Sequence, residues 1–597
     1  MRRTFHERAA DVRLGRDAAL DAWMYGLMVD NNIAYPLNPA IIAGPEQLAF
    51  MVWLEEGQVY LPCSDSVFRQ LQSRDKTALR AQYLEIWQQT RKMVCRVAAR
   101  HVRRLLLQFC RLRYRQAVAA GTILPTRLAK RMATSVLTFD DPWGDPWQEG
   151  RRAAHARQRR LLQLPALQAA LDYLPPQTDT AETSRSLQAE GRRLSRHALA
   201  RRLALALAGS ELAEACCGEG AAGDLPEAAR EAHFQELFAR AEQELASACR
   251  CLLEVAARGG TVLLLCDREG GTVHDLELAR FCTGLGLRVI YAVKSACHDN
   301  APTLDDLEGD PALTECVSRD GILHDERISK NALLRHLRAH RLTIMGDGTG
   351  EALNLYRVSV SFSRAWKEAD LVLAKGRTSA DILLGTSHAF TRDILCFWRD
   401  GEGMHGVFRP HSPHALKFNE RDIARQADAI IEEMRAARRA GKNVMFYSCI
   451  IGSIPGQTHT AIELVTAFID KLRRQMDNTF IINPAEHFVA GMDGDDLMFM
   501  WERVQRSGCI DIWRFQTVED IEESFALLGR KVPAVWTGKD ATYSTGCTKE
   551  MRIALEMQAV NREMQIIGPE ARMFMRRGEY GVGKYFDAAL GRTQHEQ

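Results

Sequence analysis

Residues 261–271 read TVLLLCDREGG. The first part of this segment, Thr261–Cys266, is a continuous apolar run, and a helical pattern from about Val273 to Leu285 follows it. A short apolar run that ends in turn residues and leads into a helix is typical of a strand buried on both faces. The segment therefore predicts the first strand of a parallel sheet that is covered by helices.

Similar apolar runs alternate with helical patterns in the part of the chain that follows this segment. They lie at Leu287–Val293, Leu342–Met345, Leu371–Ala374 and Asp393–Phe397. A second series follows at Asn443–Ile451, Thr479–Ile482, Ile510–Arg514, Ala534–Thr537 and Gln565–Ile567. Strands that alternate with helices favour parallel sheets. We therefore predict an α/β protein with two doubly wound, Rossmann-like domains.

Composition divides the 597 residues into three parts, which agrees with the two or three domains that this length favours. Residues 1–255 are rich in Arg, Ala, Leu and Glu, contain few strand-like runs, and are predicted to be mainly helical. The first α/β domain is predicted at 256–410 and the second at 415–597. A linker is predicted at Phe408–His414, which contains proline and histidine.

Net charge, the length of apolar runs and cysteine content indicate which broad class of protein this is. Lys and Arg total 78 against 76 Asp and Glu, a net charge of +2, so we expect no nucleic-acid partner. No apolar run approaches about 18 residues, so we expect no membrane partner. The fifteen cysteines include no CxxC pair, and the first residues do not resemble a signal peptide. Together these features predict a cytoplasmic protein with reduced thiols.

One arginine-rich stretch, Lys92–Arg115, repeats apolar residues at helical spacing. It has two interpretations: a surface for an anionic partner, or a solvated helix face along which arginine side chains lie. The second is the commoner arrangement in proteins.

Polar side chains follow three predicted strands of the first α/β domain. Asp267 follows the first, Asp299 the second, and Lys375 the Leu371–Ala374 strand. Ligands of open parallel sheets bind beyond the carboxyl ends of strands, so two carboxylates and an ammonium would meet there if the strands are neighbours. That set suits a divalent cation and a phosphate. An aspartate after a strand is, however, more often a helix N-cap.

These loops resemble those of the damage-control phosphatases with an ARMT-like domain, which act on phosphometabolites with a divalent metal. The most specific match is Ala369–Gly376, which reads ADLVLAKG, and the DREGG loop and His298-Asp299 match the other two signatures. The resemblance covers about residues 140–410. It implies catalytic residues Asp267, Asp299 and Lys375, with Asp267 and Asp299 as ligands of Mn, Mg, Co or Ni. In the same loops Arg268, Glu269, Gly376, Ser379 and Asp381 are candidate contacts of a small phosphorylated metabolite.

The sequence departs from this family at the metal loop. Arg268 stands where the family has a ligand Asn, and a guanidinium has no lone pair to offer a cation. Ser379 and Asp381 stand where the family has Asn and Glu. Three possibilities remain open: Asp267, Asp299 and waters hold the metal, the metal is lost, or Arg268 is a fixed charge in its place.

The second α/β domain resembles no family that we identify. Its loop at 452–458, GSIPGQT, lies between a predicted strand and a helix, where backbone N–H groups can bind an anion. A tight turn with Thr458 as N-cap is the alternative. Ser453, Gln457 and Lys539 are its candidate ligand residues. We predict that this edge faces the Asp267 edge across one cleft; two independent modules are the alternative.

The leading functional hypothesis is a metal-dependent phosphohydrolase of a small phosphorylated metabolite. One alternative is a degenerate, non-catalytic binding or regulatory protein, which Arg268 motivates. The other is a transferase whose second α/β domain binds a nucleotide-type donor.

Overall fold

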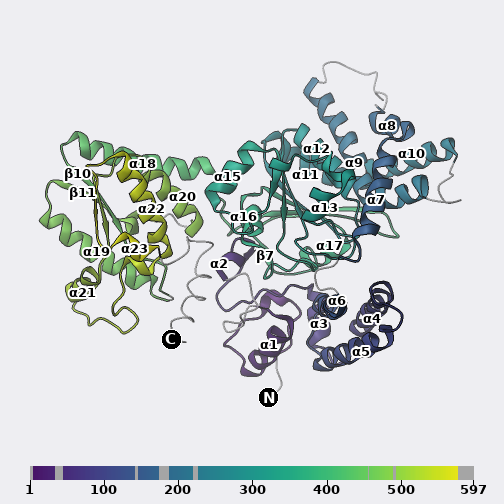
Figure 1. Ribbon diagram of the computed structural model, residues 1–597, viewed down its shortest axis with the longest axis horizontal. Coiled ribbons are helices and arrows are strands. Elements are labelled where there is room, and N and C mark those ends of the chain that lie inside the picture. Colours follow the sequence, from purple (N-terminus) through teal and green to yellow (C-terminus); the bar gives the residue numbers. More distant parts are fainter. Residues whose placement is uncertain are drawn as a thin grey trace. The chain divides into compact units, whose positions relative to one another are not determined.

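The computed structural model describes residues 4–33, 45–140, 145–173, 187–218, 226–454, 456–487 and 492–575. The chain forms two compact units, each of which is described by itself. Unit 1 comprises Met1–Ile328 and Ala332–Ala415, and unit 2 comprises Ser329–Asn331 and Leu416–Gln597. Both units combine helices with a parallel sheet (Figure 1). The predicted α/β fold class is therefore confirmed, while the division into three domains stays a prediction.

Unit 1 is built on a seven-stranded sheet of order β4-β5-β3-β2-β6-β8-β9, parallel except for β9. Its strands are β2 (Thr261–Leu265), β3 (Arg288–Val293), β4 (Ile322–Leu323), β5 (Leu342–Gly346), β6 (Leu371–Lys375), β8 (Asp393–Arg399) and β9 (Met404–Arg409). Strands β3 and β5 lie on one side of β2, and β6 lies on its other side. The strand order thus reverses between β2 and β6, which makes their carboxyl ends the topological switch point.

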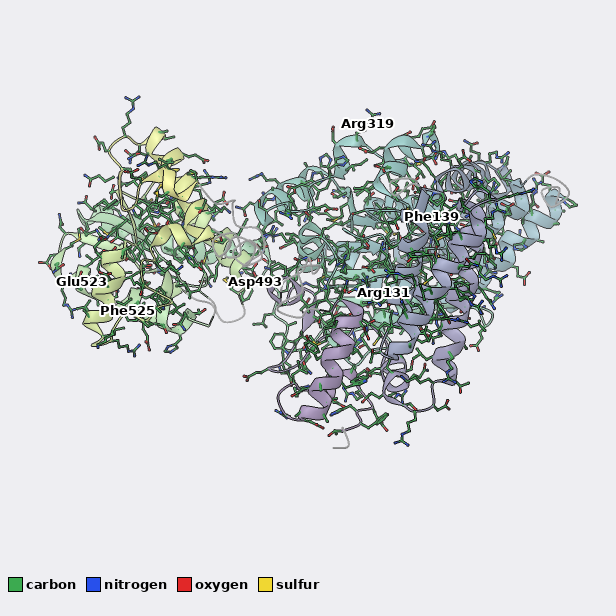
Figure 2. The ribbon with its side chains drawn as sticks, turned by 60° about the horizontal axis from the view of Figure 1, so that its bottom comes forward. Arg131, Phe139, Arg319, Asp493, Glu523 and Phe525 are labelled. Atoms are coloured by element: carbon green, nitrogen blue, oxygen red, sulfur yellow. The ribbon has the colours of Figure 1, made fainter. Side chains whose placement is uncertain are left out.

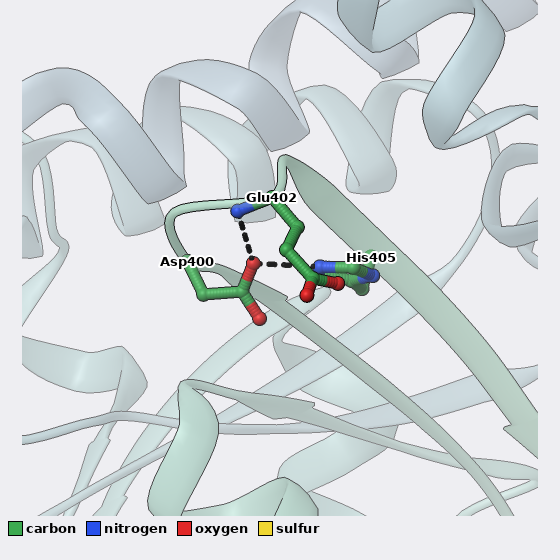
Figure 3. A group of neighbouring side chains, drawn as sticks. All are labelled: Asp400, Glu402 and His405. Atoms are coloured by element: carbon green, nitrogen blue, oxygen red, sulfur yellow. Dashed lines mark hydrogen bonds and ion pairs between the residues drawn. The ribbon is translucent and has the colours of Figure 1, made fainter.

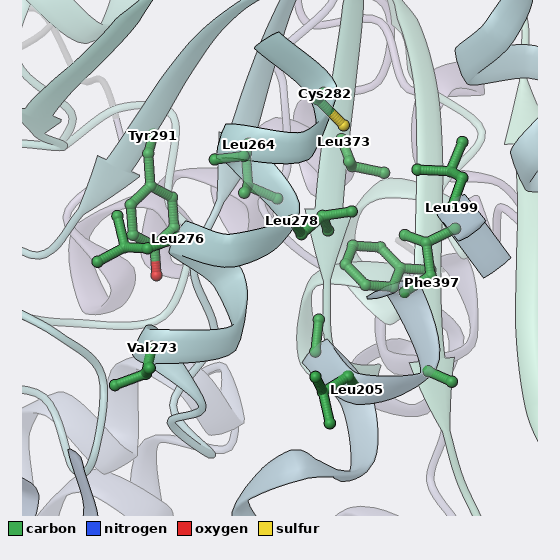
Figure 4. Close-up of a cluster of buried hydrophobic side chains, with 14 of the residues drawn as sticks. Leu199, Leu205, Leu264, Val273, Leu276, Leu278, Cys282, Tyr291, Leu373 and Phe397 are labelled. Atoms are coloured by element: carbon green, nitrogen blue, oxygen red, sulfur yellow. The ribbon is translucent and has the colours of Figure 1, made fainter. Parts of the chain in front are cut away.

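The core of unit 1 fills one face of this sheet. All five side chains of β2 are buried, as expected for a strand covered on both faces. Leu264, Leu373 and Phe397 come from three strands and pack against helices α9 (Leu187–Cys217) and α12 (Thr272–Gly284) (Figure 4). Each fully buried side chain of this kind contributes roughly 1.5–3 kcal/mol. Helix α16 (Val360–Glu368), which also packs on β2, buries Phe362 and Trp366 outside this cluster.

The remaining elements of unit 1 are mostly helices. They are η1 (Ala9–Asp11), α1 (Ala18–Asn31), α2 (Pro45–Leu48), α3 (Asp65–Gln72), α4 (Thr77–Val97), α5 (Arg103–Ala120), α6 (Pro125–Asp140), α7 (Gln148–Leu162), α8 (Pro165–Asp172), α10 (Glu227–Glu244), α11 (Ala246–Ala257), α13 (Leu304–Gly309), α14 (Pro311–Thr314), η2 (Arg319–Gly321), α15 (Lys330–Ala339) and α17 (Arg377–Leu383). Helices α4, α5 and α6 pack on one another (Figure 1). Strand β1 (Val52–Trp53) pairs with β7 (Ala389–Phe390) and so joins the N-terminal segment to the sheet domain. Among the described helices, none combines the length and apolar character needed to cross a membrane.

Unit 2 has a four-stranded parallel sheet of order β11-β10-β12-β13. Its elements are α18 (Glu420–Arg439), β10 (Asn443–Ser448), α19 (Thr458–Gln475), β11 (Thr479–Ile482), η3 (Pro484–His487), α20 (Gly494–Gln505), β12 (Ile512–Phe515), α21 (Val518–Leu527), η4 (Ala541–Tyr543), α22 (Thr545–Val560), β13 (Gln565–Ile567) and α23 (Ala571–Phe574). Asp493, labelled in Figure 2, begins α20 by accepting hydrogen bonds from the backbone N–H groups of Asp495 and Asp496. The strand order reverses between β10 and β12, which gives unit 2 its own switch point.

Two sequence expectations about local structure are wrong. The predicted strand Ala534–Thr537 is a turn, in which Trp536 N–H donates to the Pro533 carbonyl and Thr537 N–H to the Ala534 carbonyl. The predicted linker begins too early, because Phe408 and Arg409 belong to β9, which pairs antiparallel with β8.

Candidate functional site

The carboxyl ends of three neighbouring strands bring the predicted loops to one edge of the unit 1 sheet. Leu265, the last residue of β2, pairs in register with Ala292 of β3 and with Ala374 of β6. The loops that begin at Asp267, Lys294 and Gly376 therefore start side by side. The three strands are therefore neighbours, which is the condition under which we expect Asp267, Asp299 and Lys375 at one edge of the sheet.

Gly376 approaches the side chain of Asp267 closely. A Cβ atom on Gly376 would lie 2.8 Å from both the Cβ and the Oδ2 atom of Asp267, and its φ of +89° is unfavourable for any other residue. Asp267 Oδ1 accepts a hydrogen bond from the backbone N–H of Glu269 at 3.1 Å. The Asp267 side chain can occupy this position only because residue 376 has no Cβ atom.

Lys375 lies beneath the Asp267 loop. Its Nζ donates to Asp275 Oδ1 at 2.8 Å and to the carbonyl of Gly270 at 2.7 Å, and it lies 3.8 Å from Asp267 Oδ1. Asp275 also accepts from the Tyr291 hydroxyl at 3.0 Å. Burial raises the pKa of Asp275 to about 6, although Lys375 opposes this shift. Lys375 therefore holds the loop in place, and its predicted contact with a phosphate stays a prediction.

An inner pocket opens at the switch point. It is lined by Leu265, Cys266, Asp267, Arg268, Glu269, Ala292, Lys294, His298, Asp347, Ala352, Leu353, Phe362, Gly376, Arg377, Thr378 and Ser379. Five of the predicted site residues are in this set: Asp267, Arg268, Glu269, Gly376 and Ser379. The pocket also contains a buried ion pair that was not among the predicted site residues, in which Lys294 Nζ lies 2.5 Å from Asp347 Oδ2. No motif signals it, because these residues follow β3 and β5 and meet only in the folded sheet.

A larger outer cavity adjoins the inner pocket and shares Arg268, His298, Ala352 and Thr378 with it. Asp299 and Asp381, the other predicted residues of this edge, line the outer cavity. Its far wall comes from α4 and α6, which contribute Gln82, Glu85, Ile86, Gln89, Thr90, Lys92, Met93, Arg96, Pro125, Thr126, Ala129, Lys130, Ala133 and Leu137. The N-terminal helices therefore contribute to the site, which the sequence analysis did not predict.

Arg268 connects the two hollows. The carbonyl of Arg268 accepts a hydrogen bond from Asn300 N–H at 3.2 Å, which joins the loops after β2 and β3. Within the described residues its guanidinium makes no hydrogen bond or ion pair. Burial raises the pKa of Asp299, while the nearby Arg268 opposes this shift. Arg268 thus offers the site a cation that no other described protein group neutralises by direct contact.

Asp299 has an unusual backbone. Its φ of 49° lies in the left-handed region, which non-glycine residues rarely occupy. Arg151 donates to the Asp299 carbonyl at 3.4 Å and is held by ion pairs to Asp145 and Asp306. The buried Arg151 thereby fixes the loop that carries Asp299 against α7.

Metal binding by Asp267 and Asp299 stays a prediction, because within the part of the chain that the structure describes these two carboxylates do not belong to a larger group of donor side chains. Among the described residues, three donor atoms of His, Cys, Asp or Glu come within 4.8 Å of one another at Asp400, Glu402 and His405, and neither Asp267 nor Asp299 belongs to such a group. Arg268 cannot coordinate a cation. A metal at Asp267 and Asp299 would need waters and substrate for most of its ligands, as Mg²⁺ sites often do.

The group that does come together lies on the β8–β9 hairpin (Figure 3). His405 Nε2 lies 2.9 Å from Asp400 Oδ1, and Trp398 Nε1 donates to Asp400 Oδ2 at 3.2 Å. The hydrogen bond with His405 is the main reason that the pKa of Asp400 falls to about 2. These three side chains have the chemistry to bind a metal, and the sequence analysis did not single them out.

The three predicted ligand residues of unit 2 all contact other protein groups. Ser453 Oγ lies 3.1 Å from Ser544 Oγ, and Gln457 Oε1 accepts from Trp536 Nε1 at 3.2 Å. Lys539 Nζ lies 3.7 Å from the centre of the Tyr543 ring. Pro455, in the same loop as Ser453, lies outside the described residues. Ligand binding here stays a prediction, as does the shared cleft between the two α/β parts.

Comparisons with known proteins add one distant similarity. No family model matches the chain, and no curated protein matches it. The solved structure of a DUF89 family protein from Pyrococcus horikoshii is similar over 55% of this chain and 97% of that chain, at 14% identity and a TM-score of 0.34. A TM-score of this size does not establish a common fold.

Proposed function

We propose that unit 1 hydrolyses the phosphate ester of a small phosphorylated metabolite bound in the inner pocket. The observation that carries this proposal is Arg268, a guanidinium with no described protein partner, beside Asp267 at the switch point of the sheet. Arginine binds phosphate through two parallel hydrogen bonds, and switch points are where open sheets bind ligands. The resemblance of the surrounding loops to damage-control phosphatases supports the same chemistry.

In this proposal each group at the pocket has one task. Arg268 and the hydroxyls of Thr378 and Ser379 hold the phosphoryl oxygens. Asp267 accepts a proton from the attacking water as its oxygen bonds to phosphorus. The ester P–O bond then breaks, and the leaving oxygen takes a proton from solvent. Lys375 keeps the Asp267 loop in position through its contacts with Asp275 and Gly270.

The metal remains the main alternative within this function. The resemblance implies a divalent Mn, Mg, Co or Ni ion held by Asp267 and Asp299, which would supply positive charge for the phosphoryl oxygens. Because Arg268 stands where the family has a ligand Asn, we propose that its guanidinium supplies this charge. Phosphate release should then persist when divalent ions are chelated.

A panel assay tests the proposal. Phosphate release from phosphorylated metabolites is measured with chelator and with each of the four metals, for the wild type and for Asp267→Asn. Loss of a general base typically costs 10²–10⁴-fold in rate, so we expect a fall of at least about 100-fold. Asp305→Asn, the same chemical change at an exposed residue, is the matched control. Undiminished turnover in Asp267→Asn would contradict the proposal.

A non-catalytic binding protein is the second candidate. It is favoured by the buried contacts of Lys375, which direct its ammonium under the loop rather than toward a substrate. In that case phosphate esters would raise the melting temperature of unit 1 without being hydrolysed, and Arg268→Ala would abolish the rise. The transferase alternative stays a prediction for unit 2, and thermal-shift measurements with nucleotides test it.

A further inference from the structure

Helix α5 presents an apolar stripe on its outer side. Leu106, Cys110 and Ala117 are buried on the side that packs on α4 and α6. On another face, Leu105, Phe109 and Leu112 recur at the i, i+4, i+7 spacing that aligns side chains along a helix, and they are 60%, 44% and 56% exposed. Scattered single apolar residues are normal on protein surfaces, but an aligned set of three is not.

Arginines flank this stripe on both sides. With 100° of rotation per residue, Arg104, Arg111 and Arg115 fall on one side of it and Arg113 on the other. All four are exposed, and within the described part of the chain none pairs with a carboxylate. The Arg113 guanidinium lies 6.0 Å from the centre of the Phe109 ring. We call these seven residues, Leu105, Phe109, Leu112, Arg104, Arg111, Arg113 and Arg115, the α5 surface.

The surface lies in a segment from which acidic residues are missing. Residues 86–139 contain no Asp or Glu and twelve Lys or Arg residues. Because the whole chain carries +2, the other residues together carry −10. The nearly neutral total therefore conceals a strong segregation of charge. The net charge of the whole chain therefore does not indicate which partners this basic segment can bind.

We propose that the α5 surface binds the surface of an anionic lipid membrane. An amphipathic helix with Leu and Phe on one face and arginines beside them is the form that lies in the headgroup region, with its apolar side chains inserted. Each basic residue near the bilayer adds attraction to anionic headgroups. A nucleic acid would complement the arginines equally well, but it gives Leu105 and Leu112 no apolar environment. Binding at a membrane surface needs no membrane-spanning helix.

Sedimentation with lipid vesicles tests the proposal on the full chain. The vesicles contain phosphatidylcholine alone or with phosphatidylserine, at low and at high salt. We expect binding only to the vesicles with phosphatidylserine, and weaker binding at high salt. Arg111→Gln combined with Arg115→Gln should lower the partition coefficient roughly 10- to 30-fold, since each basic residue contributes about one factor of five. Phe109→Ser combined with Leu112→Ser should lower it by at least about tenfold.

Matched controls carry the same chemical changes elsewhere. Leu527→Ser and Arg562→Gln alter exposed residues of unit 2 and should leave vesicle binding unchanged. Circular dichroism of each variant shows whether the helices are retained. Absence of binding to anionic vesicles at low salt would overturn the proposal. So would tighter binding of single-stranded RNA that survives Phe109→Ser with Leu112→Ser, because the surface would then recognise a nucleic acid through charge alone.

Discussion

Gly376 and Asp267 lie so close together that a Cβ atom at position 376 would be 2.8 Å from the Asp267 Cβ and Oδ2 atoms. The contact joins the ends of β6 and β2, the two strands between which the sheet order reverses. Any side chain at 376 must therefore move the carboxylate that we assign as the base. The position of Asp267 is therefore set by a residue just beyond the end of another strand, far along the chain.

Replacing Gly376 with alanine should lower phosphate release by more than the loss of stability alone would explain. The backbone of Gly376, with φ 89° and ψ 155°, lies in a region that essentially only glycine occupies, so alanine costs roughly 1–3 kcal/mol there, and the clash displaces Asp267 in addition. Gly259→Ala is the control, because its φ is +64° with nothing within 4 Å of a Cβ. Urea unfolding should show that both variants are destabilised, with the larger loss in Gly376→Ala, whereas phosphate release should fall at least about tenfold only in Gly376→Ala. Equal activity in the two variants would argue against a role for this contact.

Lys375→Met should destabilise unit 1 by about 3–5 kcal/mol, since it leaves the buried Asp275 carboxylate without its cation. Adding Asp275→Asn removes that uncompensated charge and should restore much of the loss. A double-mutant cycle in urea measures the coupling between the two residues. Strict additivity would show that the ion pair is not coupled in the folded state.

Glu550 makes the stability of unit 2 depend on pH. Burial raises its pKa from 4.5 to about 7 in the folded state, and Gln505 Nε2 donates to Glu550 Oε1 at 3.1 Å. Because the folded pKa is the higher one, the unfolded chain loses its proton first as pH rises. Stability should therefore fall between pH 4.5 and about 7 and then level off, by about 3 kcal/mol in total.

Glu550→Gln should remove this fall and leave the variant more stable than the wild type above pH 7. Chemical unfolding at a series of pH values measures the effect. Glu556→Gln, an exposed change on the same helix, should keep the wild-type profile. If Glu550→Gln follows the wild-type curve as well, Glu550 is not protonated in the folded protein near neutral pH.

Arg268→Asn should raise the affinity of the Asp267 edge for a divalent metal. The change removes a fixed positive charge beside Asp267 and adds an amide oxygen, a ligand that hard divalent cations accept. Titration with Mn²⁺ followed by electron paramagnetic resonance should show affinity at least about tenfold higher than in the wild type. Arg268→Leu removes the same charge without adding an oxygen and separates the two contributions. Tight Mn²⁺ binding by the wild type would instead favour the metal-dependent alternative.

The strands that carry the site can be predicted from local sequence. The predictions are wrong where strand formation depends on pairing with a neighbouring strand. Thr261–Cys266 and Leu371–Ala374 were recognised because apolar side chains on both faces need a covered sheet. Ala534–Thr537 was predicted as a strand, yet this run lies between Pro533 and Gly538 and folds as a turn. The end of β9 was predicted as linker, because its pairing with β8 is a tertiary contact that its composition does not reveal.

The α/β class of this protein and the loops at the ends of its strands can be predicted from local sequence, because apolar periodicity and turn residues act over a few neighbouring positions. The contacts of those loops depend instead on the tertiary structure. Lys375 turns to Asp275 of α12, Lys294 pairs with Asp347, and α4 and α6 form the far wall of the outer cavity. A buried ammonium must take whichever carboxylate the fold brings within reach, and that choice depends on packing between segments far apart in the chain.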